Sequence, residues 1–81
     1  MSSRKQNETK FGHWDEVPGG GRRYWYDLSG RNGWRARYVK IVDAQEQTRW
    51  FGQEIYNNTG QLVETHEKYP TDKGHQKVQG Q

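Results

Sequence analysis

The chain contains no cysteine and few of the aliphatic residues that usually build a protein core. The absence of cysteine excludes disulfide bonds, thiolate zinc sites, iron–sulfur clusters and cysteine nucleophiles. Leu, Ile, Val and Phe together supply 11 of the 81 residues, a proportion typical of disordered chains. Aromatic residues make up 14%, however, and the net charge is only +3, so we expect a small folded centre with loose ends.

Long apolar runs are also missing. None approaches the roughly 20 residues that a membrane-spanning helix needs, and residues 1–10 lack the apolar stretch of a secretory signal peptide. A secreted domain of this size usually needs disulfide staples as well. We therefore expect a cytoplasmic protein that does not insert into a membrane.

Both ends of the chain are poor in core residues. The first ten residues are charged and show no periodicity, which favours a disordered arm, and the triple glycine after Pro18 favours a flexible joint. The last eleven residues contain one aliphatic side chain, that of Val78. We therefore divide the chain into a flexible arm with a glycine-rich joint, a β-sheet domain and a flexible tail, at residues 1–21, 22–70 and 71–81.

The central segment holds four runs rich in aromatic and β-branched residues, separated by turn signals. Asn32-Gly33 is a strong hairpin signal. A helix over residues 43–56 is disfavoured because Gly52 stands in its middle. The fold class predicted is mainly β, a small single-domain antiparallel four-stranded meander with a disordered N-terminal arm and a loose C-terminal tail. The strands are expected at residues 22–28, 34–43, 48–56 and 61–69.

Alternation along these runs places aromatic rings on both faces of the predicted sheet. Few residues remain to cover them, chiefly Phe11, Trp14, Val17 and Val78. The sheet should therefore either expose an aromatic surface or pack against a second chain.

Arginines alternate with rings in the first two runs. Residues 22–40 carry a net charge of +5, whereas residues 41–70 carry −3. Arginine neutralises phosphate and exposed rings stack on bases, which is how sheet surfaces bind single strands. Alternatively, the rings form the core and the arginines pack over them at the rim. The candidate nucleic-acid-binding residues are Arg22, Arg23, Trp25, Trp34, Arg35, Arg37 and Tyr38.

The histidines allow a further alternative. His66 with Glu64 or Glu67 and an arginine could move protons and steady a phosphate, as in a small toxin-like ribonuclease. The alternative without chemistry is an exposed strand whose polar face carries Glu64, His66 and Lys68 for solubility. The three histidines share no metal-ligand spacing, and the chain has neither a phosphate loop nor a serine-hydrolase motif. No catalytic, metal or cofactor residue is therefore predicted.

We thus predict a small non-enzymatic β-sheet binding module whose partner is single-stranded RNA or DNA. The first alternative is an accessory protein that uses an aromatic sheet face to form a homodimer or to bind a protein partner. The second is the toxin-like ribonuclease. Exposed rings beside the arginines favour nucleic acid, and buried rings favour the accessory protein.

Overall fold

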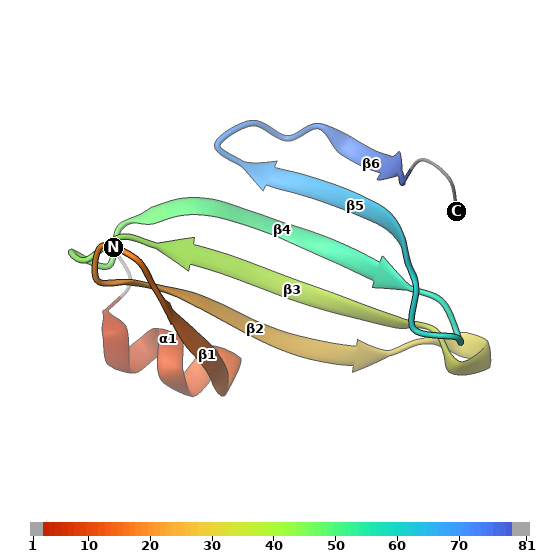
Figure 1. The fold of residues 1–81 in the computed structure, drawn as a ribbon, viewed down its shortest axis with the longest axis horizontal. Coiled ribbons are helices and arrows are strands. Elements are labelled where there is room, and N and C mark those ends of the chain that lie inside the picture. The colour runs from red at the N-terminus through yellow and green to blue at the C-terminus, as the bar shows by residue number, and fades with distance from the viewer. Residues whose placement is uncertain (1–2, 79–81) are drawn as a thin grey trace.

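The computed structural model describes residues 3–78, which form one antiparallel sheet with a helix against it (Figure 1). The strands follow one another across the sheet in chain order, so the predicted meander is confirmed, but it has six strands rather than four. The elements are α1 (Arg4–Phe11), β1 (His13–Val17), β2 (Gly21–Ser29), a 3₁₀ turn (Arg31–Gly33), β3 (Arg35–Val42), β4 (Thr48–Tyr56), β5 (Leu62–Tyr69) and β6 (Gly74–Lys77).

The four predicted strands correspond to β2, β3, β4 and β5. The turn between β2 and β3 lies at Asn32 and Gly33, whose φ angles are 58° and 81°. The Trp34 amide closes it by donating to the Arg31 carbonyl over 3.0 Å. Both central residues have the positive φ of a primed hairpin turn, as the Asn-Gly signal indicates.

The structure has a helix where the sequence analysis predicted a disordered arm. Ser3 and Gln6 form a capping box, with reciprocal side chain–backbone bonds of 3.0 and 3.1 Å. Gly12 ends the helix at a φ of 80°, and its amide donates to the Glu8 carbonyl. Only Asn7 and Phe11 of α1 are buried, so the helix shows no apolar periodicity.

The triple glycine, which was predicted as a flexible joint, lies at the turn of a hairpin and at the start of β2. Gly19 and Gly20, with φ near 90°, form the turn of a hairpin that pairs β1 with β2. Gly21 begins β2, one residue before the predicted start of that strand at residue 22. A Cβ atom there would lie 2.2 Å from the Val42 carbonyl oxygen, so the close approach of the neighbouring chain requires glycine.

The predicted loose tail contains β6, which pairs with β5. This strand is polar and gains its order from backbone pairing rather than from a buried face, which is why composition did not reveal it. The Val78 amide continues the pairing by donating to the Val63 carbonyl. The part of the predicted tail at residues 79–81, and the start of the predicted arm at residues 1–2, lie outside the described residues.

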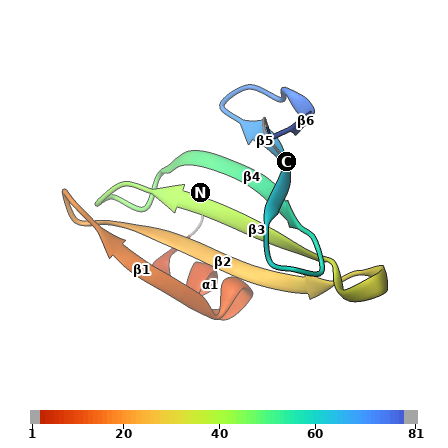
Figure 2. The same ribbon diagram turned by 45° about the vertical axis from the view of Figure 1, so that its right-hand side comes forward.

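One face of the sheet carries α1, as Figure 2 shows beside β1 and β2. We call it the helix-side face; Phe11, Tyr24 and Val42 are buried there, with Tyr26 and Phe51 packed against them. The opposite, helix-free face carries alternate residues such as Trp25 and Arg37. No helix formed by the described residues is long and apolar enough to cross a membrane.

A buried carboxylate joins α1 to the sheet. Glu46 lies in the β3–β4 turn at a φ of 66° and accepts hydrogen bonds from Tyr24, Asn7 and Arg4. Burial would raise the pKa of Glu46, but these three donors outweigh it and hold the pKa below the ordinary glutamate value. Burial and the contact with Glu46 raise the pKa of Tyr24. The charged form of Glu46 therefore stabilises the docked helix.

Glu46→Gln is expected to lower the free energy of unfolding at neutral pH by about 1–3 kcal/mol, because hydrogen bonds to a charged group become neutral ones. A lowered folded-state pKa stabilises the fold above the unfolded pKa, and that contribution is lost as pH falls through the folded pKa. The difference between variant and wild type should therefore shrink on acidification. Denaturant titrations at several pH values measure it.

The control is Glu16→Gln, which removes the charge of an exposed carboxylate that pairs with Arg22. Exposed ion pairs contribute about 0–1 kcal/mol, so this variant should stay close to wild type. Equal stability of wild type and Glu46→Gln at neutral pH would contradict the proposed role of the buried carboxylate.

Candidate nucleic-acid interface

The seven candidate residues do not share one surface. Alternation along β2 sends Arg22 to the helix-side face and both Arg23 and Trp25 to the helix-free face. Along β3, Tyr38 lies on the helix-side face, stacked on Tyr26. Trp34 is exposed in the hairpin turn. The structure brings the other four candidates together on the helix-free face: Arg23, Trp25, Arg35 and Arg37.

On the helix-free face the arginines stack on rings. The guanidinium carbons of Arg23 and Arg37 lie 5.6 and 5.5 Å from the Trp25 ring centroid. That of Arg35 lies 4.5 Å from the Tyr56 ring centroid. These cation–π contacts cover the rings with charged groups, so the rings offer little free area for stacking.

Carboxylates balance much of the charge of these arginines. Arg37 donates two hydrogen bonds to Asp27, of 2.8 and 3.1 Å, and this pairing lowers the pKa of Asp27. Arg35 lies 3.9 Å from the same carboxylate, and Arg23 lies 3.6 Å from Glu54. The helix-free face is therefore a network of internal ion pairs rather than a concentrated positive surface.

Arg22 forms ion pairs of its own on the helix-side face. Its guanidinium donates to Glu8 of α1 over 2.6 Å and to Glu16 of β1 over 3.2 Å. The hydrogen bond that Arg22 donates to Glu8 is the main reason that the pKa of Arg22 is raised. Arg22 thus ties helix, edge strand and β2 together.

The rings on the helix-side face form a row across three strands. Tyr26 stacks on Tyr38 with centroids 5.2 Å apart, and Tyr38 stacks on Phe51 at 6.5 Å. The Lys68 ammonium lies 5.3 Å from the Tyr38 centroid and 5.9 Å from that of Phe51. The aromatic row therefore has a cation at its β5 side.

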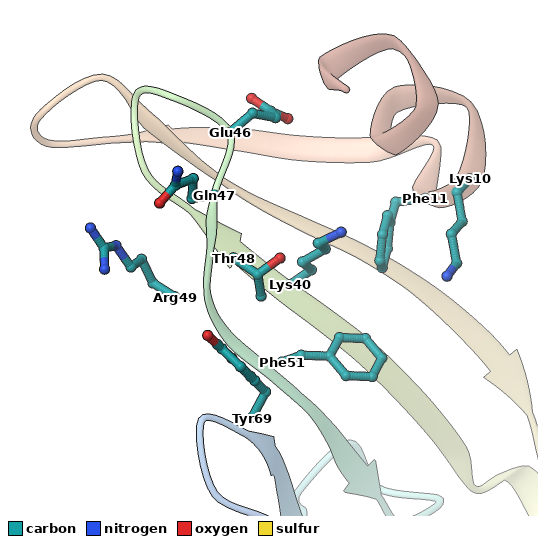
Figure 3. A pocket seen from close by; sticks show the side chains of 9 residues that line it. All are labelled: Lys10, Phe11, Lys40, Glu46, Gln47, Thr48, Arg49, Phe51 and Tyr69. Carbon is teal, nitrogen blue, oxygen red and sulfur yellow. The ribbon is translucent and has the colours of Figure 1, made fainter. Parts of the chain in front are cut away.

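A groove of about 540 Å³ lies next to this row, between the end of α1 and the start of β4. Figure 3 shows Lys10 and Phe11 of α1 on one side of it and Phe51 and Tyr69 on another. We call it the lysine–aromatic groove. Its lining residues are Lys10, Phe11, Lys40, Glu46, Gln47, Thr48, Arg49, Phe51 and Tyr69.

The charges around the lysine–aromatic groove are mainly positive. Within residues 3–78, Lys10 and Lys68 have no ion-pair partner and lie over rings instead. Lys40 donates to Asn7 over 3.1 Å, and its pKa is lowered by burial and by Lys10. The carboxylate of Glu46 accepts its hydrogen bonds from Arg4, Asn7 and Tyr24 beneath α1.

The histidine cluster differs from the set considered for a ribonuclease. His66 pairs with Asp72, at 2.7 Å, rather than with Glu64 or Glu67. Glu64 instead lies 3.2 Å from His75. Glu67 points to the helix-free face, where it accepts a hydrogen bond from Trp50.

No group of three or more potential metal ligands comes together within the described part of the chain. Comparisons with protein-family models, with curated proteins and with solved structures found no match for this chain.

The lysine–aromatic groove was not predicted from the sequence, because one of its walls is α1. The available signal was Ser3 followed three residues later by Gln6, with Gly12 at the far end, which is a helix start and stop. The other wall depends on bulges in β4 and β5, which the sequence pattern does not reveal.

Proposed function

We propose that this protein binds single-stranded nucleic acid in the lysine–aromatic groove and along the neighbouring aromatic row. The observation that supports this most strongly is the combination of rings and lysines on the helix-side face. Lys10 and Lys68 carry charges without an ion-pair partner among the described residues and lie beside rings that line or adjoin the groove.

The proposal follows from what each part of the groove can do chemically. Phe51 and Tyr69 offer apolar ring surface to an unpaired base, and stacking of this kind contributes about 1–3 kcal/mol per base. The lysines can neutralise phosphates with release of counterions. A volume of about 540 Å³ falls within the usual range for ligand sites. A duplex would hide its base faces, so a single strand fits better.

The helix-free face is the less favourable interface. A phosphate binding to Arg37 would have to displace Asp27, which already accepts two hydrogen bonds. Trp25 is likewise covered by Arg23 and Arg37. The lysine-rich face is therefore the better contact surface for a polyanion than the arginine-rich face, and Tyr38 is the residue predicted from the sequence that belongs to it.

Lys10→Ala combined with Lys68→Ala should weaken binding of a single-stranded oligonucleotide and flatten its salt dependence. Each neutralised phosphate contributes a slope of about 0.7 in log affinity against log salt, so the double variant should lose roughly 1–1.5. Fluorescence anisotropy over a salt series measures this slope.

The matched control removes two other positive charges, in Lys5→Ala combined with Arg31→Ala. Both side chains are exposed and neither lines the lysine–aromatic groove. This variant should retain most of the slope. A slope lost equally in both variants, or lost only in Arg35→Ala with Arg37→Ala, would refute the assignment to the groove. Absence of binding at low salt would favour the protein-partner alternative.

Tyr69→Ala should weaken binding by about 1–3 kcal/mol at every salt concentration, because stacking is not screened. The control is Trp34→Ala, which removes a ring of similar exposure, 42% against 48%, at the hairpin turn away from the groove. Trp34→Ala should bind as wild type does. If Trp34→Ala binds the oligonucleotide more weakly than Tyr69→Ala does, the base stacks at the hairpin and the groove is not the site.

A further inference from the structure

The β5–β6 hairpin brings two histidines together on the helix-side face. His66 and His75 are direct partners in the strand register, and their ring centroids lie 4.4 Å apart. The sheet edge where they meet is opposite the edge that carries α1 in Figure 1. Two imidazoles in contact are a pair of groups of which one can take a proton from a substrate and the other can give one.

Each histidine has its own carboxylate. The Asp72 Oδ1 atom lies 2.7 Å from Nε2 of His66, and the Glu64 Oε1 atom lies 3.2 Å from Nδ1 of His75. Asp72 also accepts from the Gly74 amide, which is the main reason that its pKa is lowered and its charge kept. A carboxylate on one ring nitrogen fixes the orientation and the tautomer of the imidazole ring.

The second nitrogen of each ring remains for a ligand. Within the described residues, His66 Nδ1 and His75 Nε2 make no hydrogen bond. His66 is largely covered, with 15% of its side chain exposed, whereas His75 is 49% exposed. The pair is therefore open to solvent mainly through His75.

The histidine pair is continuous with the proposed binding surface. His66 stands opposite Gln53 in the β4–β5 register, and Gln53 donates to the Tyr38 hydroxyl over 3.3 Å. Lys68 follows His66 by two residues on the same face and lies over Tyr38 and Phe51. A strand that stacks in the groove and contacts Lys68 can therefore reach His66 with a neighbouring phosphate.

We propose that His66 and His75 act as a general acid–base pair that cleaves single-stranded RNA, an inference that rests on the proposed function. One imidazole, in its neutral form, takes the proton of a ribose 2′-hydroxyl, and that oxygen forms a bond to phosphorus. The bond from phosphorus to the 5′ oxygen breaks, and the second, protonated imidazole gives its proton to that oxygen. The products are a 2′,3′-cyclic phosphate and a 5′-hydroxyl, so no water or metal is consumed.

The remaining groups at this site suit the same reaction. Charge accumulates on the phosphate oxygens in the transition state, and a nearby cation stabilises it. Lys68 lies two residues after His66 on the same face of β5 and can supply this cation. The reaction needs the 2′-hydroxyl, so DNA of the same sequence should bind without being cut.

The test uses the full chain with an end-labelled single-stranded RNA and the DNA oligonucleotide of the same sequence. Wild type should cut the RNA to fragments that end in a 2′,3′-cyclic phosphate and should leave the DNA intact. His66→Gln and His75→Gln should each lower the rate about 10²–10⁴-fold, the usual contribution of one acid or base. Both should keep wild-type affinity for the DNA.

The matched control is His13→Gln, a histidine stacked on Trp25 of the helix-free face, which should cut RNA at the wild-type rate. Circular dichroism verifies the fold of each variant. Because His75 is exposed, His75→Gln should fold and tests the proposal even if His66→Gln does not fold. RNA that is bound but not cut, cleavage that survives both replacements, or equal cleavage of DNA would each overturn the catalytic inference alone. Failure to bind either oligonucleotide would overturn the proposed function together with it.

Discussion

The carboxylate of Glu46 beneath α1 holds together parts of the chain that have few apolar contacts. Its three donors come from the helix and from β2, and the turn that presents it is fixed by Asp43, which accepts from the amides of Gln45 and Gln47. A charge buried without such partners would destabilise the fold strongly. Because α1 is docked here, Lys10 and Phe11 stand opposite Phe51 and form the lysine–aromatic groove.

The two faces of the sheet use positive charge in different ways. On the helix-free face, arginines stack on rings and pair with acidic groups, as Arg37 does with Trp25 and Asp27. This arrangement covers rings that the small core cannot bury. On the helix-side face, Lys68 adjoins rings without an ion-pair partner among the described residues. A polyanion gains more from the second arrangement, because it does not have to displace a carboxylate.

The central strands could be predicted because their aromatic and β-branched runs end at strong turn signals, such as Asn32-Gly33. The helix could not be predicted from periodicity, because it buries only Asn7 and Phe11, and Asn7 depends on a carboxylate 39 residues away. β6 was also not predicted, because this polar strand gains its order from backbone pairing with β5 rather than from a buried apolar face.

The candidate site was harder to predict than the strands. Alternation correctly separates Arg22 from Arg23, but it does not say which face carries the helix or which arginine meets an acidic partner. The pairing of Asp27 with Arg37 follows from the β2–β3 register, which brings the two residues opposite each other. The histidine pair likewise arises from the β5–β6 register, which no local pattern encodes.

Whether the lysine–aromatic groove binds nucleic acid is tested by finding which face of the sheet contacts a single strand. Aromatic ring resonances assigned by NMR can be followed while a short single-stranded oligonucleotide is added. We expect the resonances of Tyr38, Phe51 and Tyr69 on the helix-side face to shift, with those of Trp25 and Tyr56 little changed. Shifts confined to Trp25 and Tyr56 would contradict binding in the groove, because they would place the nucleic acid on the arginine network of the helix-free face.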